Sequence, residues 1–273
     1  MATDSINKNK TLIMGILNIT PDSFYDGGKY NSLDDALKHT EQIVEDGADI
    51  VDVGGESTRP GSESVSIDEE LKRVIPVIKE INKKFDIPIS VDTTKSKVAL
   101  EALENGASIV NDISGLNFEP EIAGIVSEHN ASIVLCHTSS RPVDMQSKTE
   151  YANIIEDVCN YLQNSINICE QNGINSDNIF IDPGIGFGKT VKDNLLLLKS
   201  LSQLKKLGKK ILVGTSMKSF IGKTLDTDDV QMRIDGTFAT TVISVLNGAD
   251  VVRVHDVKKM KTAVEMTRAV MDA

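Results

Sequence analysis

A glycine-rich segment with a carboxylate and a lysine, D-P-G-I-G-F-G-K-T at 182–190, directly follows a short apolar run. A carboxylate emerging with three glycines where a buried strand ends indicates a ligand site. The segment is not a Walker loop, because that motif requires glycine where Pro183 stands. Its G-x-G-x-G spacing also differs from the dinucleotide fingerprint G-x-G-x-x-G. A turn shaped only for packing is the alternative interpretation.

Polar side chains follow other short apolar runs in the same way. Any one of them could be an ordinary helix N-cap, but their number favours a shared functional site. One set could bind the edge of a flat, nitrogen-rich heterocycle, because carboxylates accept and ammonium groups donate hydrogen bonds: Asp92, Asn111, Asp182 and Lys218. A second set could hold an anion and a hard cation: Asn18, Arg253 and His255. Asp112 and His137 also stand at predicted strand ends.

Two connecting segments, Ile19 to Ser32 and Gly54 to Asp68, are more than twice as long as ordinary strand-to-helix loops. The first contains T-P-D-S-F and the second G-G-E-S-T-R-P-G. In the second, Thr58 and Arg59 offer hydroxyl and guanidinium donors suited to an anionic substrate and to lid closure. A solvated surface loop is the alternative interpretation for Ser62 to Ser66.

The chain has no recognisable activated nucleophile. Cys136 falls inside a strand pattern, no serine lies in a G-x-S-x-G elbow, and no histidine pair has zincin spacing. The site is therefore predicted to orient substrates and stabilise charge without forming a covalent enzyme intermediate.

The elements that must position these residues are short β-branched runs alternating with amphipathic stretches. The clearest amphipathic stretch places Ile155, Val158, Leu162 and Ile166 on one helical face. Eight strand-plus-helix units in about 250 residues predict a single (β/α)8 TIM barrel, with a doubly wound open sheet as the alternative. The runs are Leu12–Leu17, Ile50–Val53, Ile87–Val91, Ser108–Val110, Ser132–Leu135, Asn178–Ile181, Lys210–Val213 and Asp250–Val254.

Composition indicates one domain, 12–273, after a polar N-terminal tail, 1–11. Forty per cent of the 273 residues are hydrophobic, and no linker-like segment divides the chain. A net charge of -11 argues against nucleic acid as a partner. No apolar run approaches a membrane span and no signal core is present, so we expect a cytoplasmic protein without membrane partners.

Seven motifs in order, over about Leu12 to Met271, resemble the dihydropteroate synthase family. They are M-G-I-L-N-I-T-P-D-S-F-Y-D-G-G at 14, G-G-E-S-T-R-P-G at 54, V-D-T at 91, N-D-I-S-G at 111, D-P-G-I-G-F-G-K at 182, S-x-K-S-F-I-G at 216 and R-V-H-D at 253. The resemblance implies a TIM barrel, a homodimer, and condensation of 6-hydroxymethyl-7,8-dihydropterin diphosphate with 4-aminobenzoate to give 7,8-dihydropteroate and diphosphate.

The resemblance also implies residue roles. Pterin-ring binding falls to Asp92, Asn111, Asp182 and Lys218, a Mg2+ ligand to Asn18, and diphosphate contacts to Thr58, Arg253 and His255. Asp92 and Lys218 are the expected catalytic residues, because Asp92 can stabilise the positive charge that develops on the pterin as diphosphate leaves. Expected contacts to the amine are Phe24, Thr58, Arg59, Pro60, Phe187 and Ser219.

The sequence departs from the family pattern in two places. S-R-K-S reads Ser216 to Ser219 with Met217 as its second residue, and M-H-M-x-G-x-P reads Cys136 to Pro142 with Thr138 as its third. Two other functions share part of the pattern. A pterin-dependent methyltransferase would have N-D-I-S-G and D-P-G but no need of a diphosphate site, and a pterin-binding paralogue would lack turnover.

Overall fold

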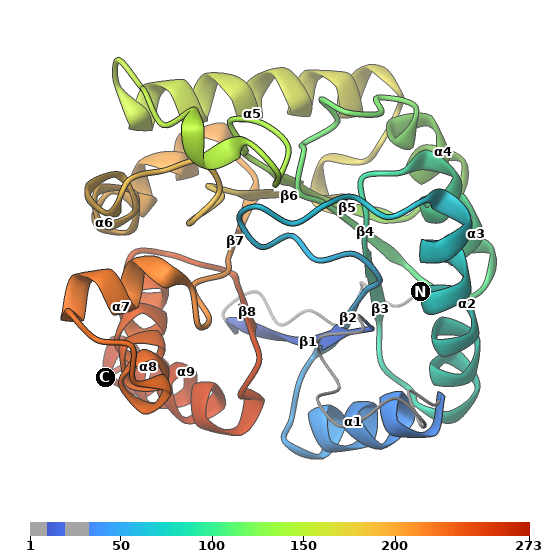
Figure 1. Ribbon diagram of the computed structural model, residues 1–273, viewed down its shortest axis with the longest axis horizontal. Coiled ribbons are helices and arrows are strands. Elements are labelled where there is room, and N and C mark those ends of the chain that lie inside the picture. The colour runs from blue at the N-terminus through green and yellow to red at the C-terminus, as the bar shows by residue number, and fades with distance from the viewer. Residues whose placement is uncertain (1–9, 20–32) are drawn as a thin grey trace.

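The computed structural model describes residues 10–19 and 33–273, which form a closed barrel of parallel strands surrounded by helices (Figure 1). Neighbouring strands pair in chain order, and β1 pairs with β8 to close the barrel. The predicted (β/α)8 barrel is confirmed and the doubly wound sheet is excluded. The strands are β1 (Leu12–Asn18), β2 (Ile50–Gly54), β3 (Ile89–Asp92), β4 (Ile109–Asp112), β5 (Ser132–Cys136), β6 (Ile179–Asp182), β7 (Lys210–Val213) and β8 (Val251–Val254).

The outer ring consists of α1 (Leu33–Glu45), α2 (Ile67–Lys84), α3 (Ser96–Glu104), α4 (Ile122–Glu128), α5 (Ile154–Gln171), α6 (Val191–Lys199), α7 (Ser219–Leu225), α8 (Val230–Leu246) and α9 (Val257–Met271). Short 3-10 helices span Met145–Ser147, Ser176–Asn178 and Leu201–Leu207. The connection from β7 to β8 contains two helices where a single helical stretch was predicted. The first of them, α7, ends at Asp226, whose left-handed backbone (φ 51°) stops the helix.

Helix α5 shows how the sequence pattern becomes packing. The predicted stripe of Ile155, Val158, Leu162 and Ile166 is buried, as expected for the face of a helix that covers the barrel. The helix begins after Asn153, whose side chain accepts hydrogen bonds from the backbone N–H groups of Ile155 and Glu156. None of the helices within residues 10–19 and 33–273 is both long and apolar enough to span a lipid bilayer.

The strands are buried on both faces, as parallel strands in a barrel must be. One apolar cluster fills the barrel interior, and a larger one lies between strands and helices. The inner cluster includes Ile50, Ile109, Phe180 and Val251. Because side chains alternate along a strand, the residues two positions further on also point inward. These next residues are Asp52, Asn111, Asp182 and Arg253. The interior therefore changes from apolar to charged toward the C-terminal ends of the strands.

Candidate active site

Arg253 of β8 lies between the carboxylates of Asp52 and Asp92, which come from the adjacent strands β2 and β3. Its Nε donates to Asp52 Oδ2 at 2.6 Å, and its Nη2 donates to Asp92 Oδ2 at 2.7 Å. Asn111 Nδ2 donates to the same Asp52 oxygen at 3.1 Å. Asp52 is fully buried, and its Oδ1 has no hydrogen-bond partner among the described residues. Strands β2, β3, β4 and β8 thus contribute one side chain each to a single buried network.

Two carboxylates share one guanidinium in this network, so it carries an excess of negative charge. Burial raises the pKa of Asp92 to about 7, against the opposing charge of Arg253 and with the help of the nearby Asp52. Burial lowers the pKa of Arg253, but Asp52 and Asp92 more than offset this and the net shift is upward. An excess negative charge in a dry site favours a substrate on which positive charge develops.

A second pair, Asp182 of β6 and Lys218 after β7, lies on the other side of the mouth. Asp182 Oδ1 accepts a 2.7 Å hydrogen bond from the backbone N–H of Gly184, and Oδ2 makes none within the described part of the chain. Lys218 Nζ donates to the carbonyl of Ile185 and lies 4.6 Å from the centroid of the Phe187 ring. Burial raises the pKa of Asp182 and lowers that of Lys218, while each charge opposes the shift of the other.

The glycines of D-P-G-I-G-F-G-K are required by the shape of this loop. Gly184, Gly186 and Gly188 all have positive φ angles. A Cβ on Gly184 would lie 1.8 Å from the carbonyl oxygen of His137, and one on Gly188 would lie 1.8 Å from Ser139 Oγ. The loop is therefore both a tightly packed turn and the support for Lys218.

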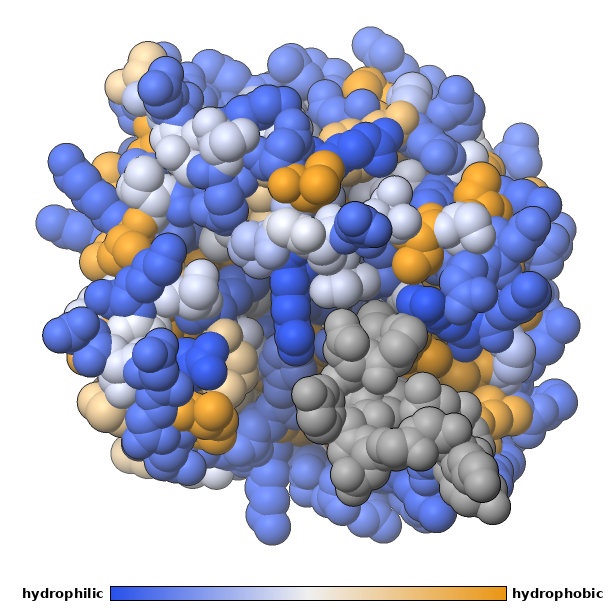
Figure 2. All heavy atoms as spheres, in the orientation of Figure 1, coloured by the Kyte–Doolittle hydropathy of each residue, from blue (hydrophilic) through white to orange (hydrophobic). Residues whose placement is uncertain are grey.

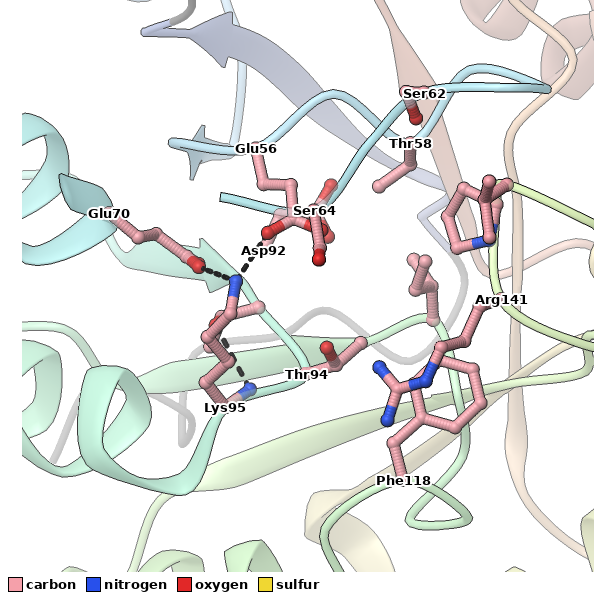
Figure 3. Close-up of a pocket in the computed structure, with 14 residues that line it drawn as sticks. Glu56, Thr58, Ser62, Ser64, Glu70, Asp92, Thr94, Lys95, Phe118 and Arg141 are labelled. Atoms are coloured by element: carbon pink, nitrogen blue, oxygen red, sulfur yellow. Dashed lines mark hydrogen bonds and ion pairs between the residues drawn. The ribbon is translucent and has the colours of Figure 1, made fainter. Parts of the chain in front are cut away.

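The loop between β2 and α2 crosses the mouth of the barrel (Figure 1) and is anchored at its base and at its tip. At the base, Lys95 forms ion pairs with Glu56 of the loop and with Glu70 of α2 (Figure 3). At the tip, Gly61 N donates to Pro142 O at 2.8 Å, which joins the loop to the segment after β5. These contacts tie the loop to the start of α3, to α2 and to the segment after β5.

A pocket lies beneath the β2–α2 loop and reaches Asp92 (Figure 3). Thr58 lines it, whereas Arg59 and Pro60 are exposed on the loop. On the opposite wall, the guanidinium of Arg141 lies 4.2 Å from the centroid of the Phe118 ring. Hydrophilic side chains predominate on the face of the molecule that contains this mouth (Figure 2).

The rim beside β8 carries His255. Ser216 Oγ lies 2.9 Å from His255 Nδ1 and accepts the backbone N–H of the same residue at 3.2 Å. Although the residue is exposed at the rim, partial burial of the ring and the positive charges of Arg253 and Arg59 lower the pKa of His255 to about 4. A neutral imidazole with a fixed orientation can donate a hydrogen bond to an anion without adding charge. Ser219 is exposed at the first turn of α7.

Asn18, at the end of β1, is partly buried and its side chain makes no hydrogen bond within residues 10–19 and 33–273. A Cβ on Gly54 would lie 3.5 Å from Asn18 Oδ1 and 3.8 Å from Asp92 Oδ2, so both oxygens border the same small space. No cluster of three or more His, Cys, Asp or Glu suited to a metal occurs in the described residues. A free amide oxygen without a carboxylate cluster fits Mg2+, which keeps several waters and takes substrate phosphate oxygens as ligands.

Comparison with known proteins agrees with this geometry. The family model described as pterin binding enzyme matches residues 14–255. The chain belongs to the pterin-binding enzyme family. A dihydropteroate synthase from Clostridium beijerinckii is 50% identical over 94% of this chain and 93% of its own length. Two solved structures also cover nearly the whole barrel. The dihydropteroate synthase of Clostridium difficile, solved in the presence of pteroic acid, has a TM-score of 0.90 and 46% identity over 96% of this chain and 97% of its own. The dihydropteroate synthase of Xanthomonas albilineans, solved with 4-aminobenzoic acid, has a TM-score of 0.91 and 37% sequence identity. The match covers 97% of this chain and 94% of that one.

The structure brings most of the residues predicted from sequence to one mouth of this pterin-binding barrel. Those within the network or in direct contact with it are Asp92, Asn111 and Arg253, and those around the glycine-rich loop are Asp182, Phe187 and Lys218. Asn18, Thr58, Arg59, Ser219 and His255 lie at the rim. Phe24 and positions 20–32 of the first long loop fall outside the described residues.

Two other residues predicted at strand ends have local structural roles. Both carboxylate oxygens of Asp112 accept backbone N–H groups, from Ser114 and Leu116, at 2.7 Å. His137 is buried next to Lys189. For Asp112 the alternative of a capping role was therefore the better one.

Sequence reasoning missed Asp52, Lys95 and Lys189. A buried charge inside an apolar run is uncommon unless it is paired, so the aspartate in I-V-D-V-G carried a signal. Lys189 is part of the segment that failed as a Walker loop and received no other role. Lys95 had no distinguishing pattern, because its carboxylate partners lie 25 and 39 residues away.

Proposed function

We propose that this protein is a dihydropteroate synthase, which joins 6-hydroxymethyl-7,8-dihydropterin diphosphate and 4-aminobenzoate and releases diphosphate. The single observation that carries the proposal is that two pairs of charged residues lie in one mouth. Asp182 and Lys218 can form hydrogen bonds to a heterocycle, and Asp92 and Arg253 can stabilise the opposite charges that develop when diphosphate leaves. Relatives of this name cover nearly the whole chain, and one of their solved structures contains 4-aminobenzoic acid.

Pterin binding requires acceptors and donors directed at a flat ring in a site without bulk water. The free Oδ2 of Asp182 can accept an N–H of the amino-pyrimidinone edge, while Oδ1 stays bonded to Gly184. Asn111 offers an amide oxygen, because its Nδ2 is already bonded to Asp52. Phe187 and Lys218 supply a ring face and an ammonium group near the same end of the barrel.

The reaction breaks the bond between the pterin methylene and diphosphate, and the amine nitrogen forms a new bond to that carbon. Positive charge develops on the pterin as diphosphate leaves, and Asp92 is suited to stabilise it. Arg253, His255 and Thr58 are suited to bind the departing diphosphate. The carboxylates beside Arg253 would then stabilise the cationic pterin, while the Arg253 guanidinium would bind the diphosphate.

The amine should enter from the side of the mouth formed by the β2–α2 loop and the start of α7. Phe187 offers an apolar contact for the ring of 4-aminobenzoate, and Arg59, Pro60 and Ser219 lie at the exposed rim. Amine attack needs no base of high pKa, because the arylamine is neutral at physiological pH and loses its proton after attack.

Mg2+ is the metal that we propose for this site, with Asn18 Oδ1 as its protein ligand. When bound with the substrate diphosphate, Mg2+ would neutralise negative charge on the leaving group. Asn18 would hold it through a neutral oxygen, which leaves Asp92 free to face the pterin.

A homodimer and a cytoplasmic location remain predictions. Apolar side chains exposed on neighbouring helices suit a partner surface: Leu225 of α7, and Val230, Ile243 and Leu246 of α8. Light scattering coupled to size exclusion would test the dimer, and a monomer at micromolar concentration would contradict it.

The decisive experiment is diphosphate release that depends on 4-aminobenzoate. A dihydropteroate synthase releases diphosphate only when both substrates are present and forms dihydropteroate in equal amount. A pterin-binding protein without turnover would bind the pterin and release nothing. A methyltransferase would transfer a methyl group from a folate and ignore the diphosphate substrate.

A further inference from the structure

Lys189 ends the glycine-rich segment, yet the proposed reaction gives it no part. Its side chain is almost completely buried, with 3% of the residue exposed. Its Nζ lies 2.8 Å from His137 Nδ1, donates to Phe187 O at 2.9 Å, and reaches His137 O at 3.4 Å. No carboxylate forms an ion pair with it among the described residues. Burying a lysine whose contacts are one imidazole and two carbonyls has an unfavourable desolvation free energy. A neutral donor would serve a purely structural role without that cost.

The atoms that accept hydrogen bonds from Lys189 belong to two segments that line the proposed pterin pocket. Phe187 belongs to the 184–188 loop, which also presents the Ile185 carbonyl to Lys218. His137 follows β5, and its backbone N–H donates to the carbonyl of Asp182 at 3.1 Å. Lys189 therefore ties the end of β5 to the loop after β6, directly behind the residues that face the substrate.

The charge of Lys189 also acts on the pocket. Burial raises the pKa of Asp182, and the positive charges of Lys218, Lys189 and Arg253 oppose that rise. Burial lowers the pKa of Lys189 to about 7, so the ammonium is charged throughout the acidic range in which Asp182 would take up a proton. Burial, together with the Lys189 charge, lowers the pKa of His137, so the imidazole stays neutral and Nδ1 remains an acceptor.

We propose that Lys189 is a positioning residue for pterin binding, which fixes the 184–188 loop against Lys218 and holds a positive charge near Asp182. The charged and titratable groups around this position come from every neighbouring element: Cys136 from β5 and His137 just after it, Tyr151 and Tyr161 from the α5 side, Asp182 from β6, Asp193 from α6, Lys218 from the β7–α7 connection and Arg253 from β8. The inference rests on the proposed function, since it concerns how the pocket keeps the pterin-reading carboxylate ionised.

The test compares Lys189→Met and Lys189→Gln with a matched control. Met removes charge and donors, whereas Gln keeps an amide donor for the Phe187 carbonyl and removes only the charge. Lys209→Met is the control. The Lys209 side chain is also buried, with 4% exposed, and is paired with Glu170. It precedes β7, whereas Lys218 follows that strand, so the two lysines lie at opposite ends of β7. The measurement is calorimetric affinity for 6-hydroxymethylpterin as a function of pH, together with thermal unfolding of each variant.

Loss of the Lys189 charge raises the pKa of Asp182, so the acid limb of pterin binding should move to higher pH. A shift of about one pH unit weakens binding about tenfold on the acid side of the limb. Both Lys189 variants should show this shift, and Lys209→Met should not. Folded Lys189 variants with an unchanged limb would overturn the proposal, and so would a failure of both to fold while Lys209→Met folds. If the wild type does not bind the pterin at all, the proposed function itself fails.

Discussion

Arg253 Nη2 donates to Asp92 Oδ2 at 2.7 Å, although the two residues are 161 positions apart in the chain. The contact joins the group expected to bind diphosphate to the group expected to stabilise the cationic pterin. Before substrate arrives, each charge partly neutralises the other. Diphosphate binding to Arg253 would compete with this hydrogen bond and free an oxygen of Asp92 to face the pterin on which positive charge develops.

Arg253→Ala should weaken binding of the diphosphate substrate by about 2 to 5 kcal/mol. It should also lower the free energy of unfolding by about 3 to 5 kcal/mol, because Asp52 and Asp92 lose their shared partner. Calorimetry with the pterin diphosphate and with the pterin alone separates the two ligands. The control is Arg268→Ala, which removes an arginine bonded to Thr11 by two donors and should leave both affinities unchanged. Equal weakening of both ligands by Arg253→Ala would contradict the diphosphate assignment.

Asp52→Asn should move the acid limb of kcat/KM to lower pH. The role proposed for Asp92 requires its ionised carboxylate, so the rate should rise as pH increases through its pKa of about 7. The negative charge of Asp52 helps to raise that pKa, and its removal therefore lets Asp92 ionise at lower pH. The amide oxygen introduced can still accept from Arg253 and Asn111. A pH–rate profile of variant and wild type measures the shift, and an unchanged or more alkaline limb would count against the role of Asp92.

Asp182→Asn should weaken pterin binding at least about 100-fold, a change of roughly 2.7 kcal/mol, and leave the fold intact. The amide oxygen can keep the bond to Gly184 N, but the NH2 group then faces the N–H donors of the pterin. Asp112→Asn is the matched control. It alters the equivalent last residue of β4, whose oxygens bond only to local backbone, and should affect stability without affecting pterin affinity. An unfolded Asp182→Asn protein would favour a capping role instead.

4-Aminobenzoate should bind weakly to the free enzyme and more tightly once diphosphate, Mg2+ and a pterin are present. The β2–α2 loop carries Thr58 and Arg59, so one segment can contact both the anion and the amine, and the first ligand orders it for the second. Calorimetric titration of the amine, with the metal present and then removed by EDTA, tests this order. Equally tight binding without diphosphate or metal would mean that the amine pocket is preformed.

Glu56→Gln should make the same loop more mobile without unfolding it. The substitution keeps an oxygen for the Val65 N–H but removes the charge that pairs with Lys95, which still has Glu70. The cost in unfolding free energy should be small, about 1 kcal/mol, while cleavage of the loop by a nonspecific protease becomes faster. Glu80→Gln, which breaks an exposed pair with Lys83 on α2, is the control and should not change cleavage of the loop.

The alternation of apolar runs and amphipathic stretches was sufficient to predict the barrel. A parallel strand buried on both faces must be apolar along its length, and a covering helix must be amphipathic, so both leave local patterns in the sequence. The same reasoning found the polar residues at the strand ends, because the fold collects those ends at one mouth. The second helix in the β7–β8 connection was missed because α7 has only seven residues and ends at a single left-handed residue, Asp226.

The sequence by itself determined the fold class, the family and the identity of most residues at the mouth. Only the tertiary structure decided how those residues are paired. Asp52 and Asp92 both bind Arg253, and Lys189 binds the carbonyls of His137 and Phe187, through contacts that span up to 201 positions. A carboxylate at a strand end can bond to the backbone of the following turn, as Asp112 does, or it can face a ligand. Which of the two occurs depends on the oxygens that remain unbonded after folding. Pairing of this kind is set by barrel closure and register, which no local pattern encodes.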